Sequence, residues 1–296
     1  MKLSVVIPTH NRSEILKTTL HKILEQEGVE FEVIVVDDGS IDDTRKVIEE
    51  LNKPSGARNF VPLHYIHQPA SHQGVARNRG VEAATGDIVV FIGDDIFVEP
   101  GFLKIHHNRH KENFEENVVV LGYSTWDPAL PINDTMRFLE SSGWQFGYGF
   151  LNVGFVQNSE PYKFFYTSNI SLKRSFFDLE KFDAQFKVYG WEDVELGYRL
   201  WKNHGMKLFY APEAKALHHH LVTEEDLPKK MRAVGQSAVH FERLHPEVQV
   251  IPKGLKRFAL AIATRPFMLS IFKKFNPSLY LKLKSWAEFL EGVKMA

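Results

Sequence analysis

Short runs of apolar and β-branched residues alternate with amphipathic segments along the first hundred residues. The runs are typical of buried strands, and the segments between them have the spacing of helices that cover one face of a sheet. The pattern predicts strands at residues 3–7, 31–36, 61–66 and 87–92. Because helices separate these strands, we expect right-handed crossovers and a mainly parallel α/β sheet with flanking helices.

The starts of several predicted helices are marked by residues that commonly cap a first turn. Ser13, Asp42 or Asp43, and Thr223 each precede a segment of helical periodicity. Side-chain oxygens of these residue types accept hydrogen bonds from the free N–H groups at a helix start. We therefore expect a helix after each of them, and another helix of small residues at 73–84.

The later part of the chain is less regular. Residues 120–185 are rich in aromatic residues, Gly and Asn, which predicts strands and long loops around a pocket. The pattern then predicts a helix at 193–204 and a strand at 206–210. We expect an α/β domain at 1–222 and a helical, basic, amphipathic extension at 223–296.

The amino-acid composition excludes several classes of protein. The 296 residues are 44% hydrophobic and 25% charged, which is typical of a globular chain and excludes a disordered one. Because there is no Cys, disulfide scaffolds, thiolate catalysis and Cys-based metal sites are excluded. The start lacks a signal-peptide pattern, and no apolar run approaches the ~18 residues of a membrane span. We expect a cytoplasmic protein, with peripheral binding to the inner face of the plasma membrane left open.

The net charge of -1 conceals an uneven distribution. Residues 251–296 hold nine Lys and Arg against two Glu, whereas the preceding residues carry an excess of acids. Within residues 254–296, apolar positions recur at helical spacing between the basic residues, as in helices that lie on anionic lipid. A helical hairpin packed on the body, or a homodimer interface, is the alternative.

Two acidic pairs follow predicted strands. Asp37 and Asp38 end the second strand, and Asp94 and Asp95 follow the fourth. In an open α/β sheet, ligands bind at the carboxyl ends of the strands. Carboxylates there accept hydrogen bonds from a nucleotide or hold Mg²⁺ or Mn²⁺. Either pair alone is equally typical of a turn, but two pairs at one edge favour a metal–nucleotide site.

Other side chains are suited to binding or proton transfer. The planar guanidinium of Arg77 suits phosphate, or it is a surface charge on a helix. Glu192 and Asp193 open a helix, where an acid is either a cap or the general base of a transfer reaction. Trp191 beside them stacks on a sugar or belongs to the core.

Three histidines, His218 to His220, end the next strand-like stretch after the strand predicted at 206–210. Neutral imidazole binds transition-metal ions, and a His ligand would favour Mn²⁺ over Mg²⁺. Alternate residues of an extended segment share a face, so we expect His218 and His220 on one side and His219 on the other. A solvent-exposed run is the alternative.

Several well-known motifs are missing. The first strand is not followed by G-x-G-x-x-G, and G-x-x-x-x-G-K-[ST], G-x-S-x-G and H-E-x-x-H do not occur. This disfavours NAD enzymes, P-loop NTPases, α/β-hydrolases and zincins. The acidic body has no basic stripe with aromatic residues, which disfavours nucleic-acid binding.

A series of motifs follows in one order along the chain: Val5–Arg12, Val35–Thr44, Gly74–Gly80, Gly86–Asp95, Thr167–Arg174 and Gly190–Leu200. In residues and order they resemble the family 2 glycosyltransferases of the GT-A fold, over about residues 1–220. The resemblance implies an inverting transfer of a sugar from a nucleotide-sugar donor to an acceptor hydroxyl.

The resemblance also implies roles for the residues at the predicted sheet edge. Its nucleotide-binding residues would be Pro8, Thr9, Arg12, Asp38, Arg77 and Asp94. Thr9 and Asp38 would contact the base and Asp94 the ribose. Asp95 and His218 would hold Mn²⁺ or Mg²⁺ on the diphosphate.

For the transfer itself, the resemblance implies Asp193 as general base, with Asn169, Trp191 and Glu192 in the acceptor or sugar pocket. One departure from the family is Gly93, which stands at the first position of its Asp-x-Asp motif. The Gln-x-x-Arg-Trp motif and the transmembrane helices of processive synthases are also missing from the sequence, so we expect addition of a single sugar.

Alternatives remain open at this point. UDP is the favoured donor nucleotide, with dTDP and GDP not excluded, and the acceptor is expected to be a glycan or a lipid-linked sugar in surface polysaccharide, lipopolysaccharide or glycolipid synthesis. A nucleotidyltransferase is a second enzyme class with an α/β sheet and Mg²⁺. Gly93 also leaves open a catalytically weakened sugar-nucleotide-binding or scaffold protein.

Overall fold

The computed structural model describes residues 1–53, 61–157 and 160–296. The chain divides into two compact units, termed here the sheet unit and the helical unit. The sheet unit consists of Met1–Leu130, Tyr148–Ala184 and Asp193–His220, and the helical unit of Pro131–Gly147, Gln185–Glu192 and Leu221–Ala296. Two internal stretches of the expected α/β domain thus belong to the helical unit, which the sequence pattern did not indicate.

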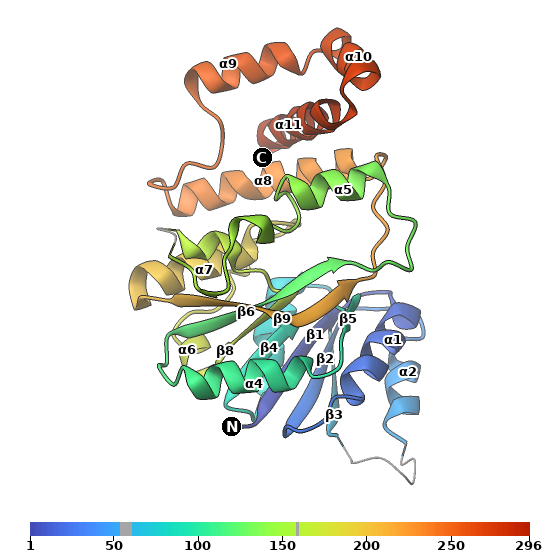
Figure 1. Cartoon of the computed structure of the whole chain (residues 1–296). Helices are drawn as coiled ribbons and strands as arrows, with labels where there is room; N and C mark the ends of the chain where they lie inside the picture. The colour runs from blue at the N-terminus through green and yellow to red at the C-terminus, as the bar shows by residue number, and fades with distance from the viewer. Residues whose placement is uncertain (54–60, 158–159) are drawn as a thin grey trace. The chain divides into compact units, whose positions relative to one another are not determined.

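A sheet of nine strands, counted over the described residues, runs through the sheet unit (Figure 1). The strand order is β3-β2-β1-β4-β8-β6-β9-β5, and β7 pairs with β9. The strands β3, β2, β1 and β4 are parallel, as predicted, whereas β8 is antiparallel to β4 and to β6. The sheet is therefore mixed. Its strands are β1 Leu3–Thr9, β2 Phe31–Asp38, β3 Leu63–Gln68, β4 Ile88–Ile92, β5 Ile96–Val98, β6 Val118–Trp126, β7 Gly154–Phe155, β8 Asn169–Lys173 and β9 Lys207–His218.

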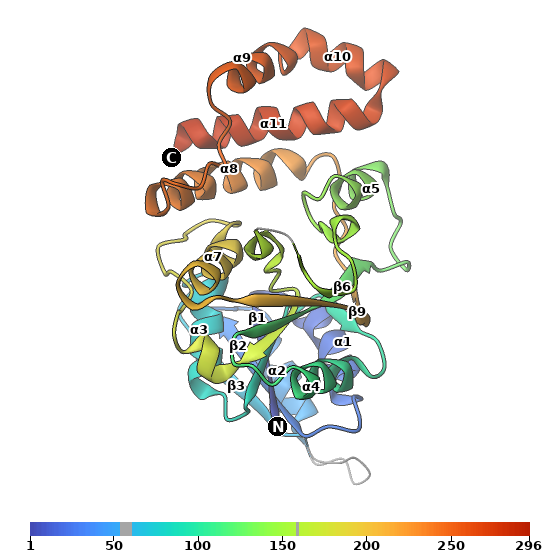
Figure 2. The same cartoon turned by 60° about the vertical axis from the view of Figure 1, so that its left-hand side comes forward.

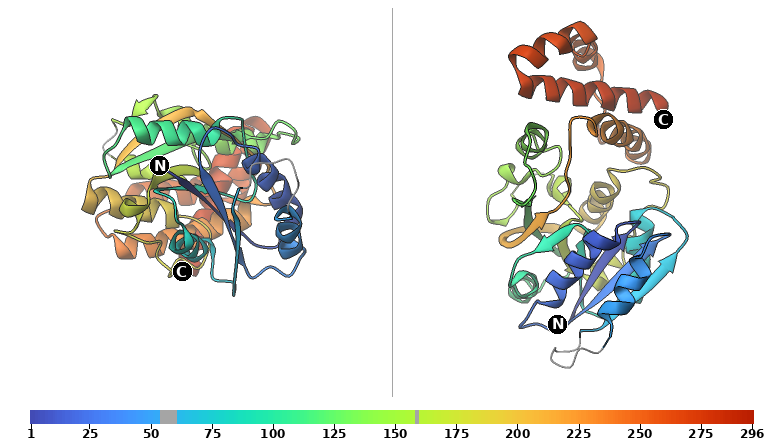
Figure 3. Two further views of the ribbon diagram at one scale, coloured as in Figure 1. Left: turned by 90° about the horizontal axis from the view of Figure 1, so that it is seen from below. Right: turned by 90° about the vertical axis from the view of Figure 1, so that its right-hand side faces the viewer.

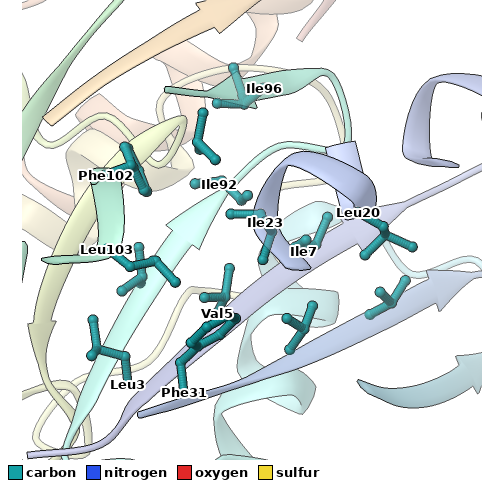
Figure 4. Packing of buried hydrophobic residues seen from close by; sticks show 14 of the residues in the cluster. Leu3, Val5, Ile7, Leu20, Ile23, Phe31, Ile92, Ile96, Phe102 and Leu103 are labelled. Carbon is teal, nitrogen blue, oxygen red and sulfur yellow. The ribbon is translucent and has the colours of Figure 1, made fainter. Parts of the chain in front are cut away.

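Alternation along the first strands gives each face of the sheet its own apolar side chains. Leu3, Val5 and Ile7 are fully buried in the core on the face covered by α1 (Ser13–Leu24) and α2 (Thr44–Leu51) (Figure 4). Figure 3 shows these two helices side by side. Full burial of such a side chain contributes about 1.5–3 kcal/mol, so this core fixes the position of the strand ends.

The opposite face of β1 and β2 is covered by α3 (Gln73–Ala83) (Figure 2). A Cβ atom at Gly80 would lie 2.4 Å from Cγ1 of Val6, so only glycine allows α3 to approach the sheet this closely. The close approach explains the run of small residues in this helix. It also buries Arg77, which lies one turn before Gly80.

The expected helix caps differ from the structure in detail. Ser13 is the first residue of α1 and donates its backbone N–H to Oδ2 of Asp42 over 2.9 Å. Asp42 also accepts from the residue that starts α2. Thr223 does not cap the long helix α8 (Leu227–Leu244). Its N–H and hydroxyl instead donate to Asp226 at the N-cap position, because the chain turns once more before the helix begins.

The strand expected at 206–210 is longer in the structure and continues to His218. Ala214 and Ala216 are buried in the core, whereas Glu213 and Lys215 point outward. Because this short alternation has few large apolar residues, the sequence indicated it only as a separate strand-like stretch that ends at the histidines. The other α-helices in the described part of the sheet unit are α4 Phe102–Glu112, α6 Arg174–Phe177 and α7 Glu192–His204, whose first residue still belongs to the helical unit.

The helical unit is built around α11 (Pro277–Met295), which lies along α8 (Figure 1). Two glycines allow the close contact. A Cβ at Gly235 would lie 2.1 Å from the carbonyl oxygen of Phe289, and one at Gly292 would lie 2.1 Å from that of Arg232. The remaining helices in the described part of this unit are α5 Asp134–Ser141, α9 Gly254–Ala263 and α10 Pro266–Phe275.

The apolar stripe predicted in the last helix forms the core of the helical unit. Leu283 and Leu290 are buried, and Trp286 meets Trp144 edge to face with ring centroids 5.1 Å apart. By contrast, α9 and α10 contain no buried residue. Across the described residues, none of the helices has the length and apolar character needed to cross a membrane.

Candidate active site

The carboxyl ends of β1, β2 and β4 meet at one edge of the sheet. Thr9, the last residue of β1, pairs with Asp37 of β2, and Asp94 follows β4 on the other side of β1. The Thr9 hydroxyl donates to Oδ2 of Asp94 over 2.8 Å. The predicted meeting of the two acidic pairs at this edge is confirmed.

Arg12 links the two adjacent carboxylates. Its Nη1 lies 2.9 Å from Oδ1 of Asp94, and its Nη2 lies 2.9 Å from Oδ2 of Asp95. Both carboxylates are buried, so they need a cation or several donors to remain charged. The guanidinium supplies that charge from the loop after β1.

The two carboxylates have different pKa values because their surroundings differ. Burial raises the pKa of Asp94, and the neighbouring Asp95 charge adds to this effect. Burial would also raise the pKa of Asp95, but His218 and Arg12 beside it hold that pKa well below its usual range. Asp95 is therefore the more acidic of the two carboxylates and the one better suited to bind a cation.

The histidines at the end of β9 face Asp95 in the predicted alternation. Nε2 of His218 lies 3.2 Å, and Nδ1 of His220 3.7 Å, from Oδ2 of Asp95. Their rings are stacked with centroids 5.6 Å apart, and His218 also stacks on Trp126. His219 points the other way and its Nδ1 lies 2.7 Å from Oδ2 of Asp127. The expectation that His218 and His220 share a face is confirmed.

These side chains fit a divalent cation that is shared with a bound phosphate. Across the described residues, no three His, Cys, Asp or Glu side chains are placed to hold a metal ion by themselves. A carboxylate and an imidazole suffice, however, where substrate phosphates supply further ligands. Asp95 and His218 converge at 3.2 Å and offer that pair, with His220 adjacent.

Gly93 has a steric explanation at this position. A Cβ atom at residue 93 would lie 2.9 Å from Oδ1 of Asp95. Glycine therefore leaves room for the Asp95 carboxylate to keep its orientation toward His218. The departure from the Asp-x-Asp pattern is compatible with an intact metal-binding acid.

Asp38 is hydrogen-bonded to the loop between β3 and α3. Its carboxylate accepts from Nε2 of Gln68 over 2.8 Å and from the backbone N–H groups of Ser71 over 2.8 Å and His72 over 2.9 Å. The carboxylate thus shapes the loop that borders the expected base pocket. Asp37 joins the end of β2 to the next turn and to β3, since it accepts from the N–H of Ser40 and the hydroxyl of Tyr65.

The remaining predicted nucleotide-binding residues lie on the same half of the sheet. Pro8 is a buried residue of β1 and pairs with Val36 of β2. Arg77 is buried in α3, with its guanidinium over the ring of Phe182 at 5.6 Å. A buried guanidinium has little water around it and is suited to an anionic ligand or to a fixed structural role.

Asp193 reaches the same edge by way of β8. Because β8 is antiparallel to β4, Asn169 pairs with Ile92, just before Asp94. Two residues before Asn169, the N–H of Thr167 lies 3.5 Å from Oδ2 of Asp193. The partly exposed Asp193 carboxylate therefore lies beside the residues that lead into β8, the strand that pairs with β4.

Asn169 does not line a pocket in this structure. Its side chain is fully buried, donates to the carbonyl oxygens of Tyr123 and Ala214, and has Oδ1 3.0 Å from Nε2 of His106. It joins β8 to β6, β9 and α4. This role corrects the expected contact with the acceptor or sugar.

Trp191 and Glu192 belong to the helical unit. The indole N–H of Trp191 donates to the carbonyl oxygen of Val234 over 3.2 Å, and the ring packs on Phe241. The structure therefore favours the core alternative for Trp191. Glu192 is buried at the first turn of α7.

Strained backbone occurs at the loops that border the site. Among the described residues, the non-glycine residues with positive φ are Asn11 at 53°, His72 at 74° and Trp191 at 67°. Such conformations cost about 1–3 kcal/mol each and concentrate at ligand-binding sites. Asn11 follows β1, His72 precedes α3, and Trp191 precedes α7, next to Asp193.

Sequence reasoning did not assign two residues that the structure places at the site. His220 lies 3.7 Å from Asp95, and the Trp126 ring supports His218. The alternation of the His run signalled His220. Nothing in the sequence indicated Trp126, because its contact with His218 depends on the parallel pairing of β6 with β9.

The family model for glycosyl transferase family 2 matches residues 4–177, which is more than half of the chain. The chain belongs to glycosyl transferase family 2. It has the GT-A fold, a mixed α/β sheet with flanking helices. The predicted family and fold are confirmed.

One relative among curated proteins is the uncharacterized glycosyltransferase YfnE of Bacillus subtilis. It is 30% identical over 246 residues, which cover 68% of this chain and 60% of the relative. The chain thus spans less than two thirds of that protein.

Two solved structures share the fold at low identity. The mannosyltransferase PcManGT from Pyrobaculum calidifontis, in complex with GDP-Man and Mn²⁺, has a TM-score of 0.65 and 18% identity, covering 98% of this chain and 85% of that one. TarS 1-349 of S. aureus, in complex with UDP, has a TM-score of 0.57 and 19% identity, covering 99% and 90%.

Proposed function

We propose that this protein transfers a single sugar, with inversion, from a nucleotide-sugar donor to an acceptor hydroxyl in a reaction that depends on a divalent cation. The observation that carries the proposal is the cluster of Arg12, Asp94, Asp95 and His218 at the carboxyl edge of the sheet. Family membership supports the reaction class.

Asp95 and His218 are the residues that would hold the cation. When bound, Mn²⁺ or Mg²⁺ offsets the negative charge that develops on the departing nucleoside diphosphate. Arg12 carries a permanent positive charge beside the same carboxylates and would face the donor phosphates. UDP is the donor nucleotide that we favour. Among the fold relatives, TarS was solved with UDP and PcManGT with GDP-Man and Mn²⁺.

Asp94 and Thr9 would orient the donor. The Thr9 hydroxyl donates to Oδ2 of Asp94, and Thr19 donates to the Asp94 carbonyl oxygen over 2.6 Å. These bonds fix the Asp94 carboxylate at the strand end, where it would accept from ribose hydroxyl groups. Asp38 and Arg77 would border the base and the phosphates, respectively.

Asp193 would act as the general base. An acceptor hydroxyl is a poor nucleophile, and a carboxylate that takes its proton as the new bond forms typically contributes about 10²–10⁴-fold. Its partial exposure and its contact with Thr167, just before the strand that pairs with β4, support this role. We propose that the acceptor is a glycan or a lipid-linked sugar.

The experiment that tests the reaction is release of nucleoside diphosphate from a panel of UDP-, GDP- and dTDP-sugars, with Mn²⁺ and after removal of metal by a chelator. One donor is expected to be hydrolysed slowly, only with metal, and Asp95→Asn should abolish the release. A scaffold or purely binding protein would release no nucleotide from any donor while still showing a metal-dependent rise in melting temperature. That outcome would refute the proposal that this protein catalyses sugar transfer.

A further inference from the structure

The helices α9 and α10 expose a row of large apolar side chains. Neither helix contains a buried residue. The row consists of Leu255, Phe258, Ile262, Phe267 and Phe275, which are 88, 66, 42, 74 and 75% exposed. Burial of one such side chain would contribute about 1.5–3 kcal/mol, so their joint exposure within 21 residues indicates a surface that something else covers.

This exposure is not the result of a loosely attached segment. On α9, Leu255, Phe258 and Ile262 share one face by their spacing, while Leu260 packs against the core of the helical unit. The helix α10 likewise lies against α11. Both helices are therefore anchored by one face and present a second apolar face outward.

The charged residues of this segment are all bases, and two of them are paired with acids of other segments: Lys253 with Glu242 over 3.0 Å and Lys273 with Glu224 over 3.2 Å. Residues 251–276 contain no Asp or Glu, and their bases are Lys253, Lys256, Arg257, Arg265, Lys273 and Lys274. Within the described part of the chain, Arg257 and Arg265 have no acidic partner. Lys256 and Lys274 lie over the rings of Trp286 and Phe275, at 5.5 Å in each case. The exposed apolar row is thus bordered by a field of positive charge.

Exposed apolar side chains next to positive charge indicate which kind of partner fits this surface. In a symmetric dimer the same patch meets itself, so an interface between two copies would bring the four remaining bases, Lys256, Arg257, Arg265 and Lys274, against the same four bases. An anionic bilayer surface instead offers acyl chains for Phe and Leu and phosphate headgroups for Lys and Arg. Each helix has ten residues and is about 15 Å long, so it can lie in the interface but cannot span the bilayer.

We propose that α9 and α10 form a docking surface for an anionic lipid bilayer. The surface is narrower than residues 254–296, because α11 uses its apolar stripe for the core of the helical unit. This proposal does not depend on the transfer reaction.

The test is flotation of the intact chain with vesicles of phosphatidylcholine alone and of phosphatidylcholine mixed with phosphatidylglycerol. We expect binding only to the mixed vesicles, and weaker binding as salt increases, because salt screens the headgroup charge. Failure of the intact chain to bind mixed vesicles at low salt would overturn the proposal.

Two double variants locate the binding surface. Phe258→Ser with Phe267→Ser removes apolar contact, and Arg257→Glu with Arg265→Glu reverses charge; each is expected to weaken binding roughly tenfold or more. The matched controls Phe114→Ser, 81% exposed, and Lys46→Glu, on an exposed position of α2, should bind like the original chain.

The melting temperature and circular dichroism of each variant show whether it is folded, and only folded variants are compared. Equal vesicle binding by the double variants and the original chain would refute the assignment of the surface. A concentration-dependent dimer that the Phe variant loses, without any vesicle binding by the original chain, would assign the surface to a second copy instead.

Discussion

Charged side chains are buried and paired at the sheet edge, whereas they are exposed to solvent on the α9–α10 surface. At the edge, Asp94 and Asp95 are buried, and each has a cationic side chain within 2.9 Å. On α9 and α10, by contrast, bases lie exposed beside exposed Phe and Leu. Burial of an unpaired charge is costly, whereas an exposed charge needs no partner in its own chain. Paired buried charges therefore mark a built site, and unpaired exposed ones point to a partner outside the chain.

The largest expected effect concerns the reaction at the sheet edge. Asp193→Asn should lower the transfer rate about 10²–10⁴-fold, because the amide cannot accept the hydroxyl proton. Donor binding should remain, since Asp193 lies with Thr167 and not with the Arg12 cluster. Steady-state kinetics measure the transfer rate, and calorimetry measures the affinity for the donor. Near-normal turnover would eliminate Asp193 as the base. The control Asp43→Asn, at the exposed N-cap position before α2, should change neither quantity.

A second prediction concerns the ion pairs that Arg12 makes with Asp94 and Asp95 at the sheet edge. Arg12→Gln should lower the free energy of unfolding without metal by about 3 kcal/mol, because it leaves two buried carboxylates without their common cation. Added Mn²⁺ should then raise the melting temperature more in the variant than in the original chain. Equal melting temperatures of the two metal-free proteins would show that Arg12 does not hold the pair together.

A third prediction concerns the support of the exposed surface. Gly292→Ala should destabilise the helical unit by about 2–3 kcal/mol, because the new Cβ would lie 2.1 Å from the backbone carbonyl oxygen of Arg232. Urea unfolding monitored by Trp fluorescence reports on this unit through Trp144 and Trp286. Gly149→Ala is the matched control, since a Cβ there meets no atom within 4 Å. Equal losses in both variants would disprove the helix contact.

The smallest effect concerns a buried histidine of the sheet unit. Burial lowers the pKa of His106 on α4 to about 4, against about 6.5 in an unfolded chain. The unfolded state therefore binds more protons between these values, and stability is lost as the pH falls from about 6.5 to about 4. At pH 5 this loss is on the order of 2 kcal/mol relative to pH 8.

The comparison of variants isolates this residue. His106→Gln should unfold with a shallower pH dependence between pH 8 and 5, whereas His107→Gln, one residue on and less buried, should keep the original slope. Urea titrations at several pH values give the slope for each protein. An unchanged slope in His106→Gln would show that the buried imidazole is not the group that titrates.

The sequence predicted the sheet edge well because the first strands are encoded locally. Runs such as Leu3–Ile7 and Phe31–Val36 are mostly apolar, and parallel pairing puts their carboxyl ends together. The alternation of His218 and His220 was predictable for the same reason. The surroundings of Asn169 and the choice between core and pocket for Trp191 were not predictable, because whether such a side chain faces a pocket or a core depends on partners 40 or more residues away.

By itself, the sequence determined the α/β class, the family motifs, the acidic pairs after β2 and β4, and the concentration of bases after residue 251. These features follow from local periodicity and composition. The tertiary structure alone decided that Arg12 bridges Asp94 and Asp95, that Gly93 makes room for Asp95, and that α11 is buried while α9 and α10 are exposed. The physical reason is that two amphipathic helices can look alike in sequence, and only packing against a neighbour determines which apolar face is removed from water.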